Sequence, residues 1–388
     1  MSTNSSRLYV IDALRGFAIV AIMLLHNLEH FDFYFLPPHL PDWMKTLDKS
    51  VWDTLFFLFA SKSYSIFAML FGLTFFIQSN NQEKKGNDFR ARFAWRLILL
   101  FGFGMLNSMF FQGDILTIYA VIGFLLIPLA KLNNKVLIGI AAFMLLQPIE
   151  WSTLFTAIQN PNLEIANPVS WTYFGKMQEY IPNNSMLDTM IGNLTNGKKA
   201  VLLWNWENGR FFIIFAMFLL GLVAGRKQLF VSSGQSNIFW KRTLLGATIG
   251  FALFYPIRLF IPDWIESAAI ERSVLTIVSP WADIAFMLIW VSGITLLFQR
   301  KAFNKILMIF APLGRMSLSN YVIQSIIGST LYYGYGLALY KYTGASYSFI
   351  IAIVLSLLTG FFCHWWAKHF KHGPLEGIWH KLTWLGSK

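Results

Sequence analysis

The sequence predicts an all-α, polytopic membrane protein with about ten transmembrane helices and both termini in the cytoplasm. Of its 388 residues, 56% are hydrophobic and only 13% are charged, which is more apolar side chain than one soluble core of this size can bury. Apolar segments of about 20 residues, the length that crosses about 30 Å of hydrocarbon, recur along the chain. The predicted spans lie at about 9–28, 54–78, 93–112, 114–131, 136–157, 211–225, 243–261, 274–298, 315–336 and 347–367.

The basic residues are divided unevenly between the two sides of these spans. The net charge is +12, and most of the 31 lysines and arginines fall in segments that are cytoplasmic if the chain starts inside. The densest group is Lys84, Lys85, Arg90, Arg92 and Arg96, which lies between the end of the second span and the first turn of the third. This is the positive-inside pattern. The basic charge therefore reports membrane topology, and we expect no nucleic-acid partner.

Residues 1–388 are predicted to form a single integral membrane domain. We expect external loops at about 29–51 and 150–210 and a cytoplasmic segment at about 368–388. The prolines of LPPHLPDW forbid a regular helix in the first loop. The tryptophans of the second loop are interpreted as membrane-interface anchors, with stacking on sugar rings as the alternative. The single cysteine, Cys363, excludes an internal disulfide.

The first span, IDALRGFAIVAIMLLHN, carries three ionisable residues. Arg15 and His26 are eleven residues apart, so on a helix they lie only about 20° apart in angle and about 16 Å apart along the axis. Asp12 falls near the same stripe and is placed to pair with Arg15. Asp12 and Arg15 could equally be snorkelling interfacial groups. Because intramembrane ionisable residues usually line a cavity, His26 is the stronger functional candidate.

Polar residues recur at comparable depth in other spans. Asn107 follows Arg96 by the same eleven residues that separate His26 from Arg15. The remaining candidates are Lys62, Asp114, Asp283, Arg315 and Asn320. Individually they have structural explanations as helix caps, snorkelling groups and interhelical hydrogen bonds. Collectively they predict a polar cavity that opens outward.

Five sequence blocks resemble a known family. IDALRGFA, SKSYSIFAMLFGLTFF, GDILTIYAVIGFLL, GRMSLSNYVIQS and GPLEGIWHKLTW occur in the order found in the YeiB-like bacterial membrane proteins, which contain domain of unknown function 418. The first span is also similar to that of the acyltransferase-3 family, in which ten residues separate an arginine from a histidine. Both groups are thought to be related to the lysosomal heparan N-acetyltransferases, which pass acetyl groups from cytosolic acetyl-CoA to a sugar across the membrane.

The chain departs from the YeiB-like pattern at two positions. Family members commonly have asparagine at the position of His26 and histidine at the position of Asn107. We therefore hypothesise that these two positions face each other in one site, because an imidazole and an amide can hydrogen-bond whichever helix carries which.

The resemblance implies a transmembrane acyltransferase in the bacterial cytoplasmic membrane. Acyl-CoA would be the co-substrate, with no permanently bound cofactor, and the acceptor would be an extracytoplasmic glycan, glycolipid or small molecule. Arg15, Arg96 and Arg315 are candidate clamps for the CoA phosphates. His26 would be the base, and Lys62 or Asn107 would stabilise the oxyanion. Asp12, Asp114, Asp283 and Asn320 are further candidate binding residues.

Two other classes of function stay open. Pro312 and Gly314, and Pro256 in the seventh span, predict broken helices of the kind that line transport paths. The alternative is therefore a transporter or flippase for a lipid-linked or small polar molecule. A third reading is a non-catalytic partner that positions an envelope enzyme.

The C-terminal segment contains His364, His369, His372 and His380. We interpret it as a basic, aromatic membrane-surface segment rather than a metal site, because no acidic ligand accompanies the histidines. The expected partners are membrane lipids, acyl-CoA and the acceptor, and self-association into a homo-oligomer is left open.

Overall fold

The described part of the computed structural model, residues 8–31, 37, 40–160 and 167–385, is helical without strands. Its longer helices are α1 (Tyr9–Leu28), α2 (Asp42–Phe59), α3 (Lys62–Glu83), α4 (Arg90–Phe110), α12 (Arg210–Arg226), α13 (Gly234–Trp264), α14 (Ala268–Phe298), α17 (Ser317–Tyr332) and α18 (Ala345–His369). The shorter ones are α5 (Leu116–Gly123), α6 (Leu126–Leu129), α7 (Asn134–Leu145), α8 (Pro148–Gln159), α9 (Val169–Lys176), α10 (Met186–Gly192), α11 (Lys198–Glu207), α15 (Lys301–Leu307), α16 (Ala311–Arg315) and α19 (Pro374–Thr383).

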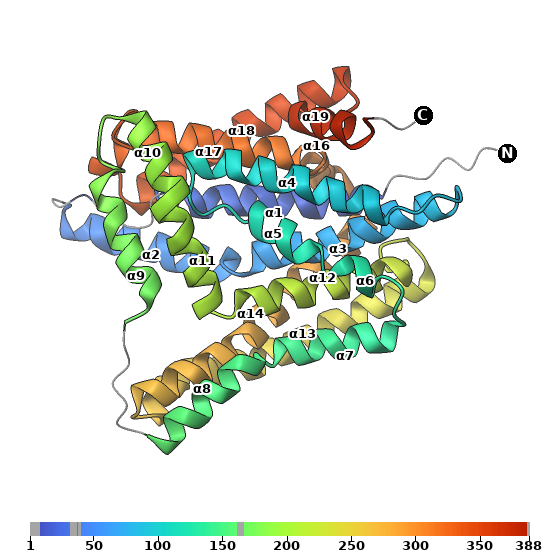
Figure 1. Cartoon of the computed structure of the whole chain (residues 1–388), viewed down its shortest axis with the longest axis horizontal. Helices are drawn as coiled ribbons and strands as arrows, with labels where there is room; N and C mark the ends of the chain where they lie inside the picture. The colour runs from blue at the N-terminus through green and yellow to red at the C-terminus, as the bar shows by residue number, and fades with distance from the viewer. Residues whose placement is uncertain (1–7, 32–36, 38–39, 161–166, 386–388) are drawn as a thin grey trace.

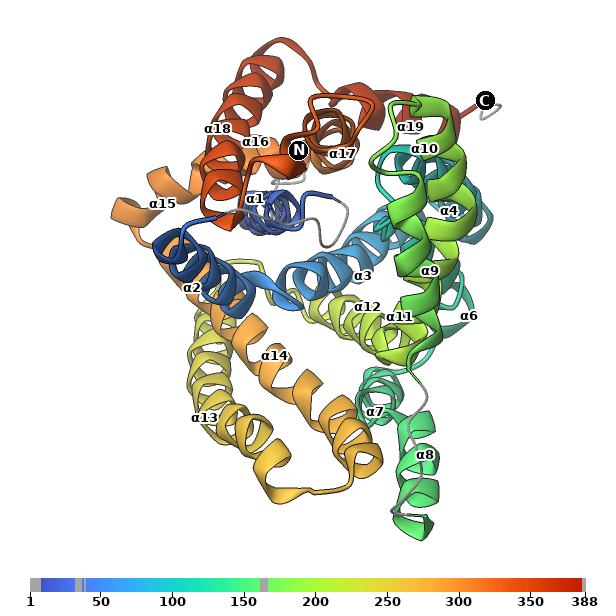
Figure 2. The same ribbon diagram turned by 90° about the vertical axis from the view of Figure 1, so that its left-hand side faces the viewer.

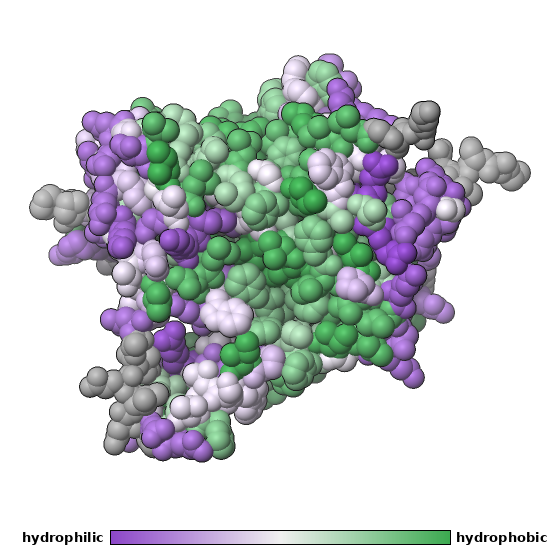
Figure 3. All heavy atoms as spheres, in the orientation of Figure 1, coloured by the Kyte–Doolittle hydropathy of each residue, from purple (hydrophilic) through white to green (hydrophobic). Residues whose placement is uncertain are grey.

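The long helices run between two polar ends of the molecule. Helices α9 and α10 lie at one end, and α19 lies at the other together with the start of α1 (Figure 1). We call these the α9 end and the α19 end. An apolar belt lies between them on the surface (Figure 3). Side chains such as Leu245, Leu357 and Phe361 are 63%, 68% and 76% exposed. A belt of this kind fits a membrane and not water.

The number of spans is smaller than the sequence predicts. Seven helical stretches in the described residues are long and apolar enough to cross a membrane, and nine if each of two bent pairs counts as one span. The predicted fourth span, 114–131, is divided into α5 and α6, of eight and four residues. The expected ten spans are therefore not confirmed, because this segment is too short and interrupted to count as a spanning helix.

Two spans are bent. The segment Met186–Glu207 meets α12 at 73°, where Gly209 has φ +61°, and Lys301–Arg315 meets α17 at 77°. The second bend follows the predicted break near Pro312 and Gly314. The expected break at Pro256 is wrong, because α13 continues through it. Membrane helices tolerate proline where neighbouring groups satisfy the freed carbonyl.

Glycine pairs set two of the closest helix crossings. A Cβ on Gly16 would overlap the carbonyl of Phe310, and one on Gly314 would overlap the carbonyl of Asp12, so α1 and α16 touch backbone to backbone. Gly72 and Gly221 do the same for α3 and α12. Small residues permit this approach where lipid supplies no hydrophobic driving force between helices.

Helix α1 occupies the middle of the bundle, with α2, α3, α16, α17 and α18 around it (Figure 2). Its side chains therefore face the interior of the bundle, and 67% of its apolar stretch is buried. The segment predicted as a loop at 150–210 contains α9, α10 and α11, which gather at the α9 end. In the 29–51 segment, α2 begins directly after Pro41.

Candidate functional site

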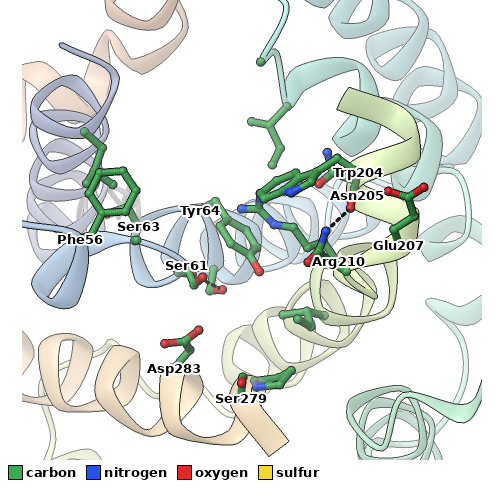
Figure 4. Close-up of a pocket in the computed structure, with 18 of the residues that line it drawn as sticks. Phe56, Ser61, Ser63, Tyr64, Trp204, Asn205, Glu207, Arg210, Ser279 and Asp283 are labelled. Atoms are coloured by element: carbon green, nitrogen blue, oxygen red, sulfur yellow. Dashed lines mark hydrogen bonds between the residues drawn. The ribbon is translucent and has the colours of Figure 1, made fainter. Parts of the chain in front are cut away.

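A cavity of about 1080 Å³ lies towards the α9 end, and we call it the α9-side cavity. Its walls come from α1, α2, α3, α9, α11, α12, α13, α14 and α17, and from the turns that precede α3, α5 and α12. Asp283 and Ser279 of α14 face Tyr64 and Arg210 across it (Figure 4). Its ionisable lining residues are His26, Glu29, Asp114, Glu207, Arg210, Arg258, Glu271, Arg272 and Asp283.

His26 lies in this wall near the end of α1. Its Nδ1 is 3.3 Å from Oε2 of Glu29, one helical turn later. Its ring centroid is 4.5 Å from that of Phe111. The carboxylate fixes one ring nitrogen, so the imidazole is oriented by a hydrogen bond in the way that catalytic histidines are.

Asn107 does not pair with His26: among the described residues, no hydrogen bond joins the two. Asn107 is fully buried, and its Nδ2 donates to Oδ1 of Asp114 at 3.2 Å. Asp114 also accepts from the backbone N–H of Thr117 and lies 3.3 Å from Nζ of Lys198. Position 107 therefore supports the cavity through Asp114, and no direct hydrogen bond joins it to position 26 among the described residues.

Lys62 and Asp283 form one unit. Nζ of Lys62 is 2.8 Å from Oδ1 of Asp283, and Nη1 of Arg258 is 3.4 Å from the same oxygen. Lys62 is 6% exposed and does not line the cavity, whereas Asp283 does. The structure thus pairs two residues that local sequence patterns could not connect, because Lys62 lies on α3 and Asp283 on α14.

The sequence did not single out Arg210. Its guanidinium lies 3.9 Å from the ring centroid of Tyr64 and 4.5 Å from that of Trp204, a double cation–π contact. Of the four tryptophans predicted as interface anchors, Trp171 and Trp204 line the cavity, while Trp151 and Trp206 do not. The only sequence signal was an arginine at the start of an unusually short apolar run.

A second cavity, of about 360 Å³, opens towards the α19 end, and we call it the α19-side cavity. Arg15, Arg96 and Arg315 all line it. Arg15 pairs with Asp12 at 3.4 Å, as the sequence predicts, and donates to Oγ1 of Thr74 at 3.0 Å. Arg96 stacks on Trp379 of α19 at 4.1 Å. Three guanidiniums from three helices thus converge, an arrangement suited to an anionic ligand.

The two cavities share part of their walls. Ile22, Tyr64, Ile115 and Tyr321 line both of them. The Tyr321 hydroxyl accepts a hydrogen bond from the Ile115 backbone N–H at 3.3 Å. We call these four side chains the partition. A thin layer of side chains, not a packed helix, therefore separates the two spaces.

Helix α19 closes one side of the α19-side cavity through Glu376. The carboxylate accepts from the backbone N–H groups of Leu318 and Ser319, at 2.8 and 3.1 Å, and from the Ser319 hydroxyl. Burial raises the pKa of Glu376, and these hydrogen bonds offset part of that rise. Glu376 thus fastens α19 to the start of α17.

Asn320 lies outside both cavity walls. Its Nδ2 donates to the Leu313 carbonyl at 3.0 Å and its Oδ1 accepts from Cys363. These contacts stabilise the bend between α16 and α17. His372 and His380 line the α19-side cavity with ring centroids 4.8 Å apart. No group of three metal-ligating side chains occurs in residues 8–31, 37, 40–160 and 167–385.

Fold and site together define a helical membrane protein with polar cavities approaching each other from opposite ends. Residues 224–386 match the family described as "Protein of unknown function (DUF418)". The whole chain is similar to uncharacterized protein YxaH of Bacillus subtilis (28% identity; 98% of this chain and 95% of that one). It is also similar to uncharacterized protein YeiB of Escherichia coli (25% identity; 96% and 95%). The C-terminal part of the chain thus matches the DUF418 family, the whole chain is similar to YeiB-like proteins, and no solved structure matches it.

Proposed function

We propose that this protein is a transmembrane acyltransferase of the bacterial cytoplasmic membrane, which takes an acyl group from cytosolic acyl-CoA and passes it to an extracytoplasmic acceptor. One observation carries the proposal: the cavity that holds Arg15, Arg96 and Arg315 and the cavity that holds His26 have four lining side chains in common, those of the partition. The α19 end is assigned to the cytoplasm because the basic residues predominate in the segments there.

The donor would enter from the α19 end. Arg15, Arg96 and Arg315 supply positive charge for its phosphates. Along α1, Arg15 and His26 are about 16 Å apart, a span suited to an extended pantetheine arm. The thioester would then lie at the partition, where both cavities give access to it.

The acceptor, a hydroxyl- or amine-bearing glycan, glycolipid or small molecule, would enter the α9-side cavity. His26 takes the acceptor proton on the ring nitrogen that does not face Glu29. The acceptor oxygen or nitrogen bonds to the thioester carbonyl carbon, and the C–S bond then breaks. The leaving thiolate receives the proton that His26 holds, so no other reactant is required.

Lys62 and Asn107 would act as positioning residues in this scheme. Lys62 holds Asp283 and Asn107 holds Asp114, and both carboxylates line the α9-side cavity. The Arg210 guanidinium is the cation of the α9-side cavity that aromatic rings hold in place, and it is the better candidate for stabilising the oxyanion.

The test uses purified protein in detergent with acetyl-CoA and longer acyl-CoAs. Binding is followed by thermal stabilisation, and released CoA thiol is measured in the same samples. Wild type and His26→Ala should both be stabilised, and only wild type should release thiol, with at least a 10²-fold difference. Full activity in His26→Ala would refute the assigned base, and absence of donor binding in both proteins would refute the transferase.

A transporter or flippase is the second candidate. The two bent spans and the thin partition are the features expected of a path that opens alternately to each side. Reconstituted vesicles distinguish the two functions. Movement of a substrate without chemical change would favour transport, whereas thiol release coupled to an acylated product would favour transfer.

A further inference from the structure

A third hollow lies at the α19 end, outside the α19-side cavity. It has a volume of about 910 Å³ and lies between the turn that joins α3 to α4 and the end of α19. We call it the turn groove. Its lining residues are Gln82, Lys85, Gly86, Asn87, Asp88, Phe89, Arg92, His380 and Trp384.

The turn groove adjoins the α19-side cavity. His380 lines both spaces, and its neighbour His372 lines the α19-side cavity. A ligand that occupies the turn groove could therefore extend past His380 towards Arg96 and the partition. The three spaces form a series from the α19 end to the α9 end.

The charge of the turn groove is positive. Its one carboxylate, Asp88, is bound by Arg90 at 2.7 Å, and this guanidinium lowers the pKa of Asp88 to about 2. Lys85 and Arg92 form no ion pair with any described residue. An anion entering the groove would thus meet two cations whose charge is not already neutralised.

The same groove offers aromatic surface. Trp384 lies at one wall with the Arg92 guanidinium 5.0 Å from its ring centroid, and Phe89 lies at another. Arg92 is held in place because its Nη1 also donates to the Thr383 carbonyl at 2.6 Å. Nucleic-acid bases stack on such rings, whatever their sequence.

We propose that the turn groove binds the 3′-phosphoadenosine portion of acyl-CoA, so that the 5′-diphosphate passes His380 to the guanidiniums of the α19-side cavity and the acyl-bearing arm continues towards the partition. This inference rests on the proposed acyltransferase function and adds the site that selects CoA over simpler thioesters. Lys85 and Arg92 contact the 3′-phosphate, and Trp384 stacks on the adenine.

The first experiment measures binding of adenosine 3′,5′-bisphosphate to the purified full-length protein by titration calorimetry. Lys85→Glu should weaken binding at least tenfold. Lys84→Glu is the matched control, because it makes the same charge change at an adjacent exposed residue that does not line the groove. Its affinity should stay within twofold of wild type. Equal affinities in both variants, or no binding to wild type, would overturn the proposal.

The second experiment compares acetyl-CoA with acetyl-pantetheine, which lacks the nucleotide. Lys85→Glu should raise the KM for acetyl-CoA by the factor measured in the titration and leave acetyl-pantetheine turnover unchanged. If wild type and Lys85→Glu release thiol from acetyl-CoA with the same KM, the nucleotide site in the turn groove is refuted and the proposed transferase is not. Bisphosphate binding lost in Lys85→Glu, with no thiol released from either donor, would support the nucleotide site and refute the transferase.

An anionic lipid headgroup is the other source of phosphate at this end. The titration is therefore repeated in nanodiscs of phosphatidylglycerol and of phosphatidylcholine. Bisphosphate binding that depends on Lys85 in both lipids supports a soluble nucleotide. Association with phosphatidylglycerol that Lys85→Glu abolishes, without any bisphosphate binding, would overturn the proposal in favour of a lipid contact.

Discussion

The two cavities that meet at the partition differ in the balance of charge on their walls. The α9-side cavity has five carboxylates against three guanidiniums, and Asp114, Asp283 and Glu29 each have a basic partner within 3.4 Å. The α19-side cavity has three guanidiniums against the single carboxylate of Glu376, which α17 already occupies. In the α9-side cavity these carboxylates are already paired with basic groups, which suits a polar acceptor. The α19-side cavity keeps a net positive charge, which suits an anionic donor.

The largest effect is expected when the ion pair between Lys62 and Asp283, in the wall of the α9-side cavity, is broken. Asp283→Asn leaves the buried Lys62 ammonium without its partner, and breaking such a pair costs about 3–5 kcal/mol. We expect a marked loss of thermal stability in detergent. Asp263→Asn, an exposed carboxylate at the end of α13, is the control and should leave the melting temperature unchanged. The double variant Lys62→Met/Asp283→Asn should recover part of the loss, and an unchanged single variant would contradict a structural pair.

The partition gives the next largest effect. Ile22→Trp fills the space where the cavities meet, and a misplaced reactant loses about 10²-fold in rate. We expect transfer to fall by at least that factor while acyl-CoA still binds. Ile326→Trp, on the exposed side of α17, is the matched control and should behave as wild type. Undiminished thiol release in Ile22→Trp would show that the reaction does not pass between the cavities.

The positive wall of the α19-side cavity predicts a smaller effect. Arg315→Gln removes one guanidinium, and a hydrogen bond to a charged group is worth about 1.5–3 kcal/mol. The KM for acyl-CoA should rise about tenfold or more, with kcat little changed. Arg300→Gln, exposed and outside the cavity wall, should have no effect. A lower kcat at constant KM would mean that Arg315 acts on the chemical step instead.

The smallest expected effect is a pH dependence of α19 docking. Because burial raises the pKa of Glu376, the docked helix holds a proton more tightly than the released one. Docking is then strongest below the ordinary pKa of glutamate and weakens as the pH rises through the raised value. Hydrogen exchange of residues 374–383, corrected for intrinsic rates, should show less protection at pH 7.5 than at pH 4.5. Glu376→Gln should flatten this difference, and a steeper loss at low pH would contradict the sign.

The sequence identified individual polar residues more successfully than their partners. His26, Asp114 and Asp283 line the α9-side cavity, and Arg15, Arg96 and Arg315 line the α19-side cavity. The helical offset of eleven residues put Arg15 and His26 on one stripe, and the structure places them in two adjoining cavities. Arg210 and Glu376 were not identified, because Arg210 contacts Tyr64 and Glu376 contacts Leu318, each more than 50 positions away in the sequence.

The sequence by itself determined the class and most of the spanning segments, because apolar length and the distribution of positive charge are local properties of the chain. It also determined the Asp12–Arg15 pair, which one helical turn brings together. Only the tertiary structure decided that Lys62 binds Asp283, that Asn107 supports Asp114, and that four side chains separate two cavities. These contacts join helices distant in sequence, and close backbone crossings such as that of Gly16 with Gly314 fix which side chains meet.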